Sequence, residues 1–143
     1  MIKIGKNISR FSTYSYKPES KEELDKIIND KIEKEGLNCN LNDIDTSLIT
    51  DMCWLFYKSE FNGNISNWDV SNVKRMIGMF YMSCFNQDIL KWDISNVKDM
   101  RNMFSESFFN KNISKWKISK SCDTRAMFNK IIFNDEFKPK SLQ

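Results

Sequence analysis

Three aspartates recur at a fixed interval of 24 residues and are the first residues in this chain with a spacing that suggests chemistry: Asp45, Asp69 and Asp93. A row of carboxylates can bind calcium or act as an acid–base pair. Each one, however, precedes a β-branched residue and a Ser, which is typical of an acidic residue at the start of a helix. The same column holds Lys117 in a later unit, so we interpret the aspartates as structural.

Residues that most enzymes need for catalysis are scarce. The chain has no His, which removes Ser–His and Cys–His pairs and the commonest ligand of transition metals. Its four glycines are scattered, so no phosphate-binding glycine loop is present. The four cysteines form no C-x-x-C pair, and we expect reduced thiols rather than disulfides. The sequence therefore predicts no catalytic residue, no metal site and no cofactor.

Basic residues gather toward the C-terminus, where residues 97 to 143 carry ten basic and five acidic side chains. One positive field there would attract nucleic acid or an acidic protein surface. A lysine-rich face that is simply solvated has the same composition, so both interpretations remain open. The cations that we single out as tentative partner-binding residues are Lys111, Lys115, Lys117, Lys120 and Arg125.

A 24-residue repeat must position all of these side chains. Its apolar positions return in register, with a Phe-Asn pair, an Ile, a Trp and a Met-Phe pair in successive units, and such a period indicates a repeat architecture. A row of tryptophans also suggests stacking of nucleic-acid bases, but a ladder of identical apolar residues is more typical of a core. The predicted core residues are Phe61, Ile65, Trp68, Val73, Met76, Phe80, Phe85, Ile89, Trp92, Val97, Met100, Phe104, Phe109, Ile113, Trp116 and Phe128.

An asparagine also returns once in every unit, directly after the Phe of the Phe-Asn pair in most of them. An inward amide at this place can form a hydrogen bond with the backbone of the next coil. Five amides in one register favour that role over five independent surface residues. The predicted series is Asn38, Asn62, Asn86, Asn110 and Asn134.

The first part of the chain predicts a capping helix. Ser20 and Glu23 form a capping-box pattern, apolar residues share one helical face after them, and Gly36 supplies a stop, so we expect a helix over 21 to 35. The resulting division of the chain has four parts. These are a tail or edge strand over 1–20, a capping helix and divergent first unit over 21–44, four 24-residue repeats over 45–137, and a tail over 138–143.

Within each unit, two periodicities predict the local structure. Val73, Met76 and Phe80 recur at three- and four-residue spacing, which favours a short helix or helical turn. The polar segment over 88–91 has room for a short extended piece, and we expect such pieces to form a narrow parallel ladder. The fold class predicted from the residues is an α/β repeat, a solenoid with one short parallel strand and one helical turn per unit.

The repeated phrase resembles that of a known family. It reads Phe-Asn, two residues, Ile, two residues, Trp-Asp-Val-Ser-Asn-Val, two residues, Met, two residues, Met-Phe. This is similar to the repeat of the BspA-like leucine-rich-repeat proteins, bacterial surface proteins and lipoproteins, over about residues 21 to 137. The resemblance implies a short right-handed leucine-rich-repeat-like solenoid that contacts other proteins and has no catalytic activity.

The start of the chain lacks the features of exported members of that family. No apolar run approaches the roughly 18 residues of a membrane span. Residues 1 to 11 are interrupted by charged and polar side chains where a secretory signal needs an apolar segment, and no lipid-anchoring cysteine lies nearby. We therefore expect a cytoplasmic protein without a membrane partner.

These observations lead to a non-enzymatic protein–protein interaction module, of bacterial or phage origin, that acts as a small intracellular inhibitor or adaptor. The outward residues expected to contact the partner, besides the basic ones, are Tyr57, Tyr81, Asp88, Leu90 and Lys91. One alternative is a phage-type, anti-CRISPR-like protein that binds nucleic acid, or inhibits an enzyme acting on it, through the basic C-terminal end. A second alternative is a fragment of a surface adhesin.

Overall fold

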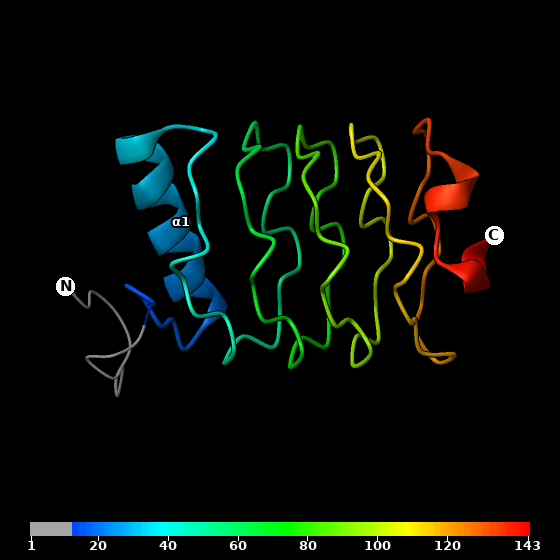
Figure 1. The fold of residues 1–143 in the computed structure, drawn as a ribbon, viewed down its shortest axis with the longest axis horizontal. Helices are drawn as coiled ribbons and strands as arrows, with labels where there is room; N and C mark the ends of the chain where they lie inside the picture. Colours follow the sequence, from blue (N-terminus) through cyan, green and yellow to red (C-terminus); the bar gives the residue numbers. More distant parts are fainter. Residues whose placement is uncertain (1–12) are drawn as a thin grey trace.

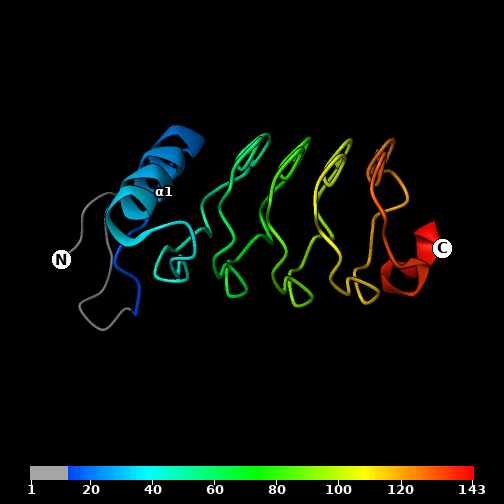
Figure 2. The same cartoon turned by 90° about the horizontal axis from the view of Figure 1, so that it is seen from above.

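The computed structural model describes residues 13–143. Within them the elements are the α-helix α1 (Lys21–Glu35) and two short 3-10 helices, η1 (Asp135–Phe137) and η2 (Lys140–Leu142). Between α1 and η1 the chain runs through similar coils that lie side by side in one row (Figure 1). The view from above shows the same row, with α1 across one end and the 3-10 helices at the other (Figure 2).

Helix α1 forms where the sequence predicts it. The Ser20 side chain accepts a hydrogen bond from the backbone N–H of Glu23 at 3.2 Å, and the Glu23 carboxylate accepts one from the N–H of Glu19 at 2.8 Å. Gly36 follows with φ of 94°, and its N–H donates to the carbonyl of Ile32. Both ends of the helix are therefore satisfied by local hydrogen bonds, and the predicted helix is confirmed.

One face of α1 covers the first coil. Leu24, Ile27 and Ile28 are buried in the common core. Lys31 is buried beside them, and its ammonium group lies 3.0 Å from a carboxylate oxygen of Asp43 in the first coil. This ion pair supplies a partner for the buried charge, so the helix is fixed to the coils by apolar packing and by one charged contact.

The prediction of an α/β leucine-rich-repeat-like solenoid is wrong. Within residues 13–143 the coils contain no strand, no sheet and no α-helical turn. They meet through isolated parallel bridges, which join Asp51 to Arg75, Arg75 to Asp99 and Asp99 to Asp123. The segment expected to be extended, 88–91, contains no strand, and its last two residues, Leu90 and Lys91, form a turn.

Left-handed residues explain why neither a strand nor a helix forms. In each coil two residues four positions apart have positive φ, for example Trp54 at 62° and Lys58 at 53°. Such a residue lies outside both the extended and the right-handed helical regions, so neither conformation can continue through it. The apolar spacing of three and four residues, which predicted a helix, belongs to a chain of successive turns. The other left-handed positions of the coils are Gly78, Met82, Asn102, Glu106, Ala126 and Lys130.

Some backbone N–H groups of a coil donate to carbonyls of the next coil, and others donate within their own coil. Along the segment 76–83, alternate N–H groups donate to carbonyls of the next coil, as Phe80 does to Met103 at 2.9 Å. Three of the N–H groups between them close turns within their own coil, as Tyr81 does to Gly78 at 3.0 Å. A regular sheet needs residue pairs that bond continuously along both partners. This segment donates only forward, so the bridges between coils stay isolated.

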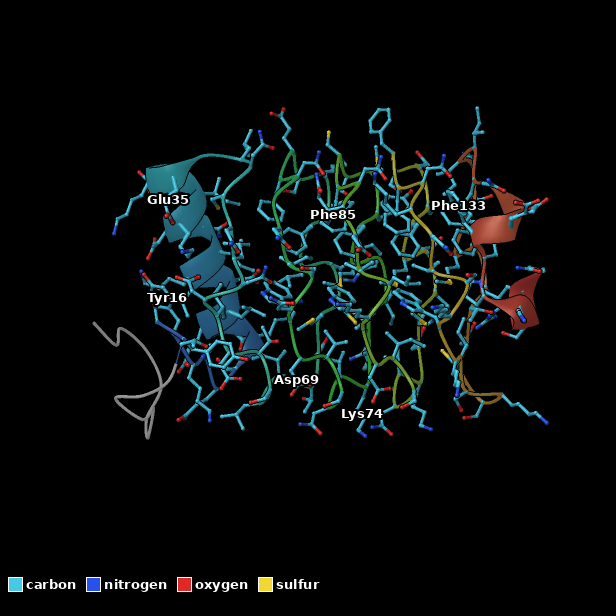
Figure 3. All side chains as sticks on the ribbon, in the orientation of Figure 1. Tyr16, Glu35, Asp69, Lys74, Phe85 and Phe133 are labelled. Carbon is cyan, nitrogen blue, oxygen red and sulfur yellow. The ribbon has the colours of Figure 1, made fainter. Side chains whose placement is uncertain are left out.

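Identical side chains stack in columns through the core. Phe80 lies parallel to Phe56 and to Phe104, with ring centroids 5.6 Å apart in both cases. Trp92 lies between the parallel rings of Trp68 and Trp116, at 6.5 and 6.4 Å. Phe85, labelled in Figure 3, belongs to a second column of phenylalanines. All of the predicted core residues are buried except Phe128, which is half-buried.

The tryptophan column cannot serve as a platform for bases. Each of its indoles is at most 4% exposed. Each indole N–H also donates to a carbonyl of the preceding coil, as Trp92 does to Ile65 at 3.1 Å. The three indoles are therefore enclosed by neighbouring side chains, and none of them has a free N–H group.

The asparagine column links successive coils. The side-chain oxygen of Asn62 accepts a hydrogen bond from the backbone N–H of Asn86 at 2.8 Å, and Asn86 does the same for Asn110 at 2.9 Å. Asn110 accepts the N–H of Asn134 at 3.2 Å. Asn38 is exposed and lies outside the series, because the N–H of Asn62 donates to a backbone carbonyl instead.

The two ends of the row contain the segments that were predicted as tails. Residues 1–12 of the predicted N-terminal tail or edge strand lie outside the described residues. Of the remainder, Tyr16 forms an isolated parallel bridge with Ile44. At the other end Ile113 donates its N–H to the carbonyl of Phe137 in η1 at 2.9 Å, so the last residues fold back against the final coil.

Replacing Trp92 by Ala is expected to lower the free energy of unfolding by about 3–5 kcal/mol, because the change leaves a cavity between two stacked indoles. Trp116→Ala should cost less, since Trp116 has a stacked indole on one side only. Urea unfolding of both variants measures the difference. Equal losses would contradict stabilisation by contacts between neighbouring coils.

Candidate functional site

The aspartate column has a structural role, although not the predicted one. No helix follows these residues. The side-chain oxygens of Asp45, Asp69 and Asp93 accept the backbone N–H of the serine two positions later, at 3.0 to 3.1 Å. Each aspartate therefore closes an Asx turn at a corner of its coil, and Asp69 lies at one edge of the row (Figure 3). Residues 13–143 place no three His, Cys, Asp or Glu side chains where they could hold a metal ion.

The cysteines are free thiols, and burial suppresses the reactivity of three of them. Burial raises the pKa of Cys53 to about 11, and burial likewise raises the pKa of Cys122 to about 11. The pKa of Cys39 is also raised by burial. Because the thiolate is the nucleophilic form, these groups are protonated and unreactive near neutral pH.

The arginines near the C-terminal end are bound to carboxylates of the chain itself. Arg125 lies 2.6 Å from Asp123 and also donates to it through Nε at 3.0 Å. Arg101 forms the equivalent pair with Asp99 at 2.8 Å. Hydrogen bonds from Arg125 lower the pKa of Asp123 to about 2. Arg125, which the sequence suggested as a partner-binding cation, is therefore already paired.

Three lysines converge on a cavity at the C-terminal end. Lys115, Lys117 and Lys140 line a volume of about 710 Å³ between the last coil and η2, with Trp116 and Ile118 among the other lining residues. Within residues 13–143 none of these three lysines forms an ion pair. The cavity therefore combines unpaired positive charge with a partly apolar wall.

The remaining predicted contact residues are dispersed. Lys111 is exposed and does not line this cavity. Lys120 borders a separate cavity of about 230 Å³. Around the predicted strand, the carboxylate of Asp88 accepts the N–H of Leu90 at 2.9 Å. Leu90 is half-buried and Lys91 is exposed. These residues lie at a turn of the coil, and none of them belongs to a strand.

Tyr57 and Tyr81 are the predicted contact residues that the fold brings together most closely. Their ring centroids lie 5.7 Å apart on neighbouring coils. Trp54 stands nearly perpendicular to both, with centroids at 5.5 and 6.0 Å and interplanar angles of 77° and 78°. With Asn102 these three aromatic residues line a groove of about 460 Å³, which we call the aromatic groove.

Gly78 makes room for the Trp54 ring. A Cβ on Gly78 would lie 2.0 Å from Cζ3 of Trp54, so no other residue fits there without moving the indole. Gly78 is also left-handed, with φ of 55°. The sequence pattern did not single out Trp54, because the residue types at its repeat position differ from unit to unit. The next two units have Gly78 and Asn102 there. The available signal was a tryptophan outside the register of the other three.

Trp54 is the tryptophan that is not buried in the core. It is 45% exposed. It also holds a left-handed φ of 62°, a conformation that costs a residue with a side chain roughly 1–2 kcal/mol. Within residues 13–143 its indole N–H has no hydrogen-bond partner, unlike those of the three buried tryptophans. The equivalent position is left-handed in the other three coils as well, so this conformation belongs to the repeat, and the exposed indole is what distinguishes Trp54.

The rim of the aromatic groove is polar and largely paired. The Tyr81 hydroxyl donates to Glu106 at 3.2 Å, and Lys130 lies 3.8 Å from the same carboxylate. The Lys58 ammonium lies over the Tyr57 ring, 5.3 Å from its centroid. The charged groups around the groove therefore have partners within the chain: Lys130 lies near Glu106, and Lys58 lies over the Tyr57 ring. The residues that line the groove are uncharged.

Comparison with known proteins gives a family but no function. A family model described as "Mycoplasma protein of unknown function, DUF285" matches residues 24–139. No curated protein matches the chain. No solved structure matches it either. None of the helices in residues 13–143 is long and apolar enough to cross a membrane. Because the matched segment is most of the chain, the chain belongs to this family.

Acid should destabilise the protein through Asp123. Its pKa lies at about 2 in the folded chain against an ordinary value of 3.8, so its stabilising contribution is complete above about pH 4 and is lost as the pH falls from about 4 to about 2. Asp123→Asn keeps an oxygen that can accept the Arg125 N–H but removes the charge. Melting temperatures between pH 2 and pH 7 should therefore depend less on pH in this variant. An equal loss in both proteins would contradict the assignment.

Proposed function

We propose that this member of a family of unknown function is a non-enzymatic protein-binding module that contacts its partner through the aromatic groove. The observation that carries the proposal is the state of Trp54, whose indole is 45% exposed and whose indole N–H has no hydrogen-bond partner within residues 13–143. Burial of an exposed indole of this size by a partner is favourable, because apolar surface is removed from water.

The composition of the groove supports binding to a protein. Tryptophan and tyrosine are enriched among the residues that dominate binding energy, because they bury a large rigid surface and lose little conformational entropy. Trp54 and Tyr57 come from one coil and Tyr81 from the next. The stacked coils therefore hold the three rings in a fixed arrangement before any partner arrives, which reduces the cost of ordering them.

The chemistry of the groove supports a role without catalysis. A general base must lie within hydrogen-bond reach of the proton that it removes. The Glu106 carboxylate beside the groove is occupied by the Tyr81 hydroxyl and lies near Lys130. The buried thiols are protonated at neutral pH, because burial raises the pKa of Cys53 and Cys122. No arrangement of these groups forms an acid–base pair or an activated nucleophile.

The finer family placement is part of the proposal. The repeated Trp-Asp-Val-Ser-Asn-Val phrase supports a relationship with BspA-like repeat proteins, which the resemblance associates with contacts between proteins. An inhibitor or an adaptor needs one rigid contact surface of this kind. We therefore retain both roles as forms of the same binding activity.

A second candidate function rests on the lysine cavity at the C-terminal end. Lys115, Lys117 and Lys140 have no ion-pair partner within residues 13–143 and face a common volume, which favours an anionic ligand such as nucleic acid. Binding of this kind weakens steeply with salt, because the polymer releases counterions when lysines neutralise its phosphates. The two candidate functions therefore predict different responses to salt and to nuclease.

A double variant of the aromatic groove distinguishes the two candidate functions. Tyr57→Ser with Tyr81→Ser introduces the residue that the next coil carries at the equivalent position, Ser105, so the fold should persist. Loss of two aromatic contacts, each worth about 1–2 kcal/mol or more, should reduce capture of the partner protein at least about tenfold. Capture is measured by quantitative mass spectrometry after a nuclease-treated lysate of the source organism is passed over the immobilised chain.

The matched control is Lys115→Glu with Lys117→Glu, which should retain the same partner. Circular dichroism of both double variants verifies folding. If the groove variant captures the partner as well as the native chain does, protein binding through the groove is wrong. If the immobilised chain captures nothing once the lysate has been treated with nuclease, and the lysine variant captures nothing from an untreated lysate, the chain binds nucleic acid and the protein-binding proposal is wrong.

A further inference from the structure

The aromatic groove presents hydrogen-bond donors that the chain itself does not use. Within residues 13–143 the indole N–H of Trp54, the hydroxyl of Tyr57 and the side-chain amide of Asn102 have no hydrogen-bond partner. The charged acceptor beside the groove, Glu106, is already engaged. A ligand that matches this set must supply acceptors, and it needs few donors of its own.

The dimensions of the groove suit a short extended segment. It runs from Trp54 on one coil, past Tyr81 on the next, to Asn102 on the one after. The ring-to-ring step between these coils is 5.6 Å at the phenylalanine column, so the groove crosses two such steps. One turn of a polyproline II helix has three residues and advances about 9 Å. About one turn of such a helix therefore fits the groove.

We propose that the aromatic groove binds a proline-rich segment of a partner protein in the polyproline II conformation. The inference rests on the proposed function and adds the chemical class of the bound segment. Polyproline II has no internal hydrogen bonds, so its carbonyls are free to accept from the groove. Proline has no N–H, so the segment brings no donor that would remain unpaired. Its flat apolar rings pack against aromatic side chains, as in other proline-binding grooves.

The arrangement of the three rings supports apolar contacts. Tyr57 and Tyr81 are tilted by 32° with their centroids 5.7 Å apart, so the two rings partly overlap across the neighbouring coils. Trp54 stands nearly perpendicular to both rings, at 77° and 78°, so aromatic surface of two orientations lines the groove. A proline ring bound here would pack against Trp54 and a tyrosine, and its carbonyl would accept from one of the unused donors of the groove.

Two other classes of ligand fit the contacts less well. An organic cation seeks several open aromatic faces, but the Lys58 ammonium already lies over Tyr57 and Lys130 stands nearby. A sugar presents hydroxyl groups that need acceptors as well as donors, and the Glu106 carboxylate is occupied. The proline-rich segment uses both the aromatic faces and the free donors, and it requires no charge.

Fluorescence of Trp54 provides a direct test. Three of the four tryptophans are at most 4% exposed, so a change in emission on binding reports mainly on Trp54. Titration of the whole chain with decaproline should give a saturable blue shift with a dissociation constant of about 0.01–1 mM, as expected for one short groove. A Gly-Ser decapeptide of the same length should give no shift. Tetramethylammonium and diacetylchitobiose are titrated in parallel.

Substitutions then locate the site. Tyr81→Ser keeps the Trp54 reporter and should weaken decaproline binding at least about tenfold. Phe108→Ala is the matched control, because Phe108 is an aromatic residue that is 72% exposed but does not line the groove. This control should bind decaproline like the native chain. Thermal unfolding of both variants verifies that neither has lost its fold.

The outcomes distinguish this inference from the proposed function. Absence of a saturable response to decaproline, a response that Tyr81→Ser does not weaken, or tighter binding of the cation or the sugar overturns the proline-rich ligand. If the groove double variant still loses its captured protein in that case, protein binding through the groove stands. Decaproline binding that the partner protein displaces supports both.

Discussion

The hydrogen bond from a backbone N–H of one coil to a carbonyl of the next is the interaction on which the other features of this molecule depend. Within residues 13–143 three successive coils donate such bonds forward from alternate residues, as Met76, Gly78 and Phe80 do. The bonds fix the register of 24 residues, and identical side chains then meet in columns. Parallel rings, buried indoles and linked asparagines follow from that register and exclude water from the core. One coil alone has none of these partners.

The same backbone pattern creates the aromatic groove. Left-handed residues let each coil turn within itself while alternate amides donate to the neighbour, and they form two columns along the row, one of which contains Trp54. Where that column changes from Trp54 to Gly78, the indole lies across the next coil, because the glycine offers no Cβ. The groove is therefore a local variation in side chains on a uniform backbone. Its walls come from adjacent coils, so its shape depends on their stacking.

The sequence predicted the features that depend on periodicity or local capping. Helix α1 follows from Ser20 and Gly36, and the 24-residue period is visible without a structure. Strands and helical turns were predicted wrongly, because the spacing of Met76 and Phe80 is the same in a chain of turns, and no glycine marks most left-handed positions. The sequence identified Tyr57 and Tyr81 but not Trp54. It also treated Arg125 as a free cation, although Asp123, two residues earlier, is its partner.

Amide hydrogen exchange tests most directly whether forward hydrogen bonds between coils hold the molecule together. In the next-to-last coil the N–H groups of Met100, Asn102 and Phe104 donate to the last coil. In the last coil the equivalent N–H groups, those of Thr124, Ala126 and Phe128, meet no carbonyl within residues 13–143. Exchange measured by NMR should be slower in the first set by a factor on the order of a hundred or more. Similar rates in the two sets would contradict the account.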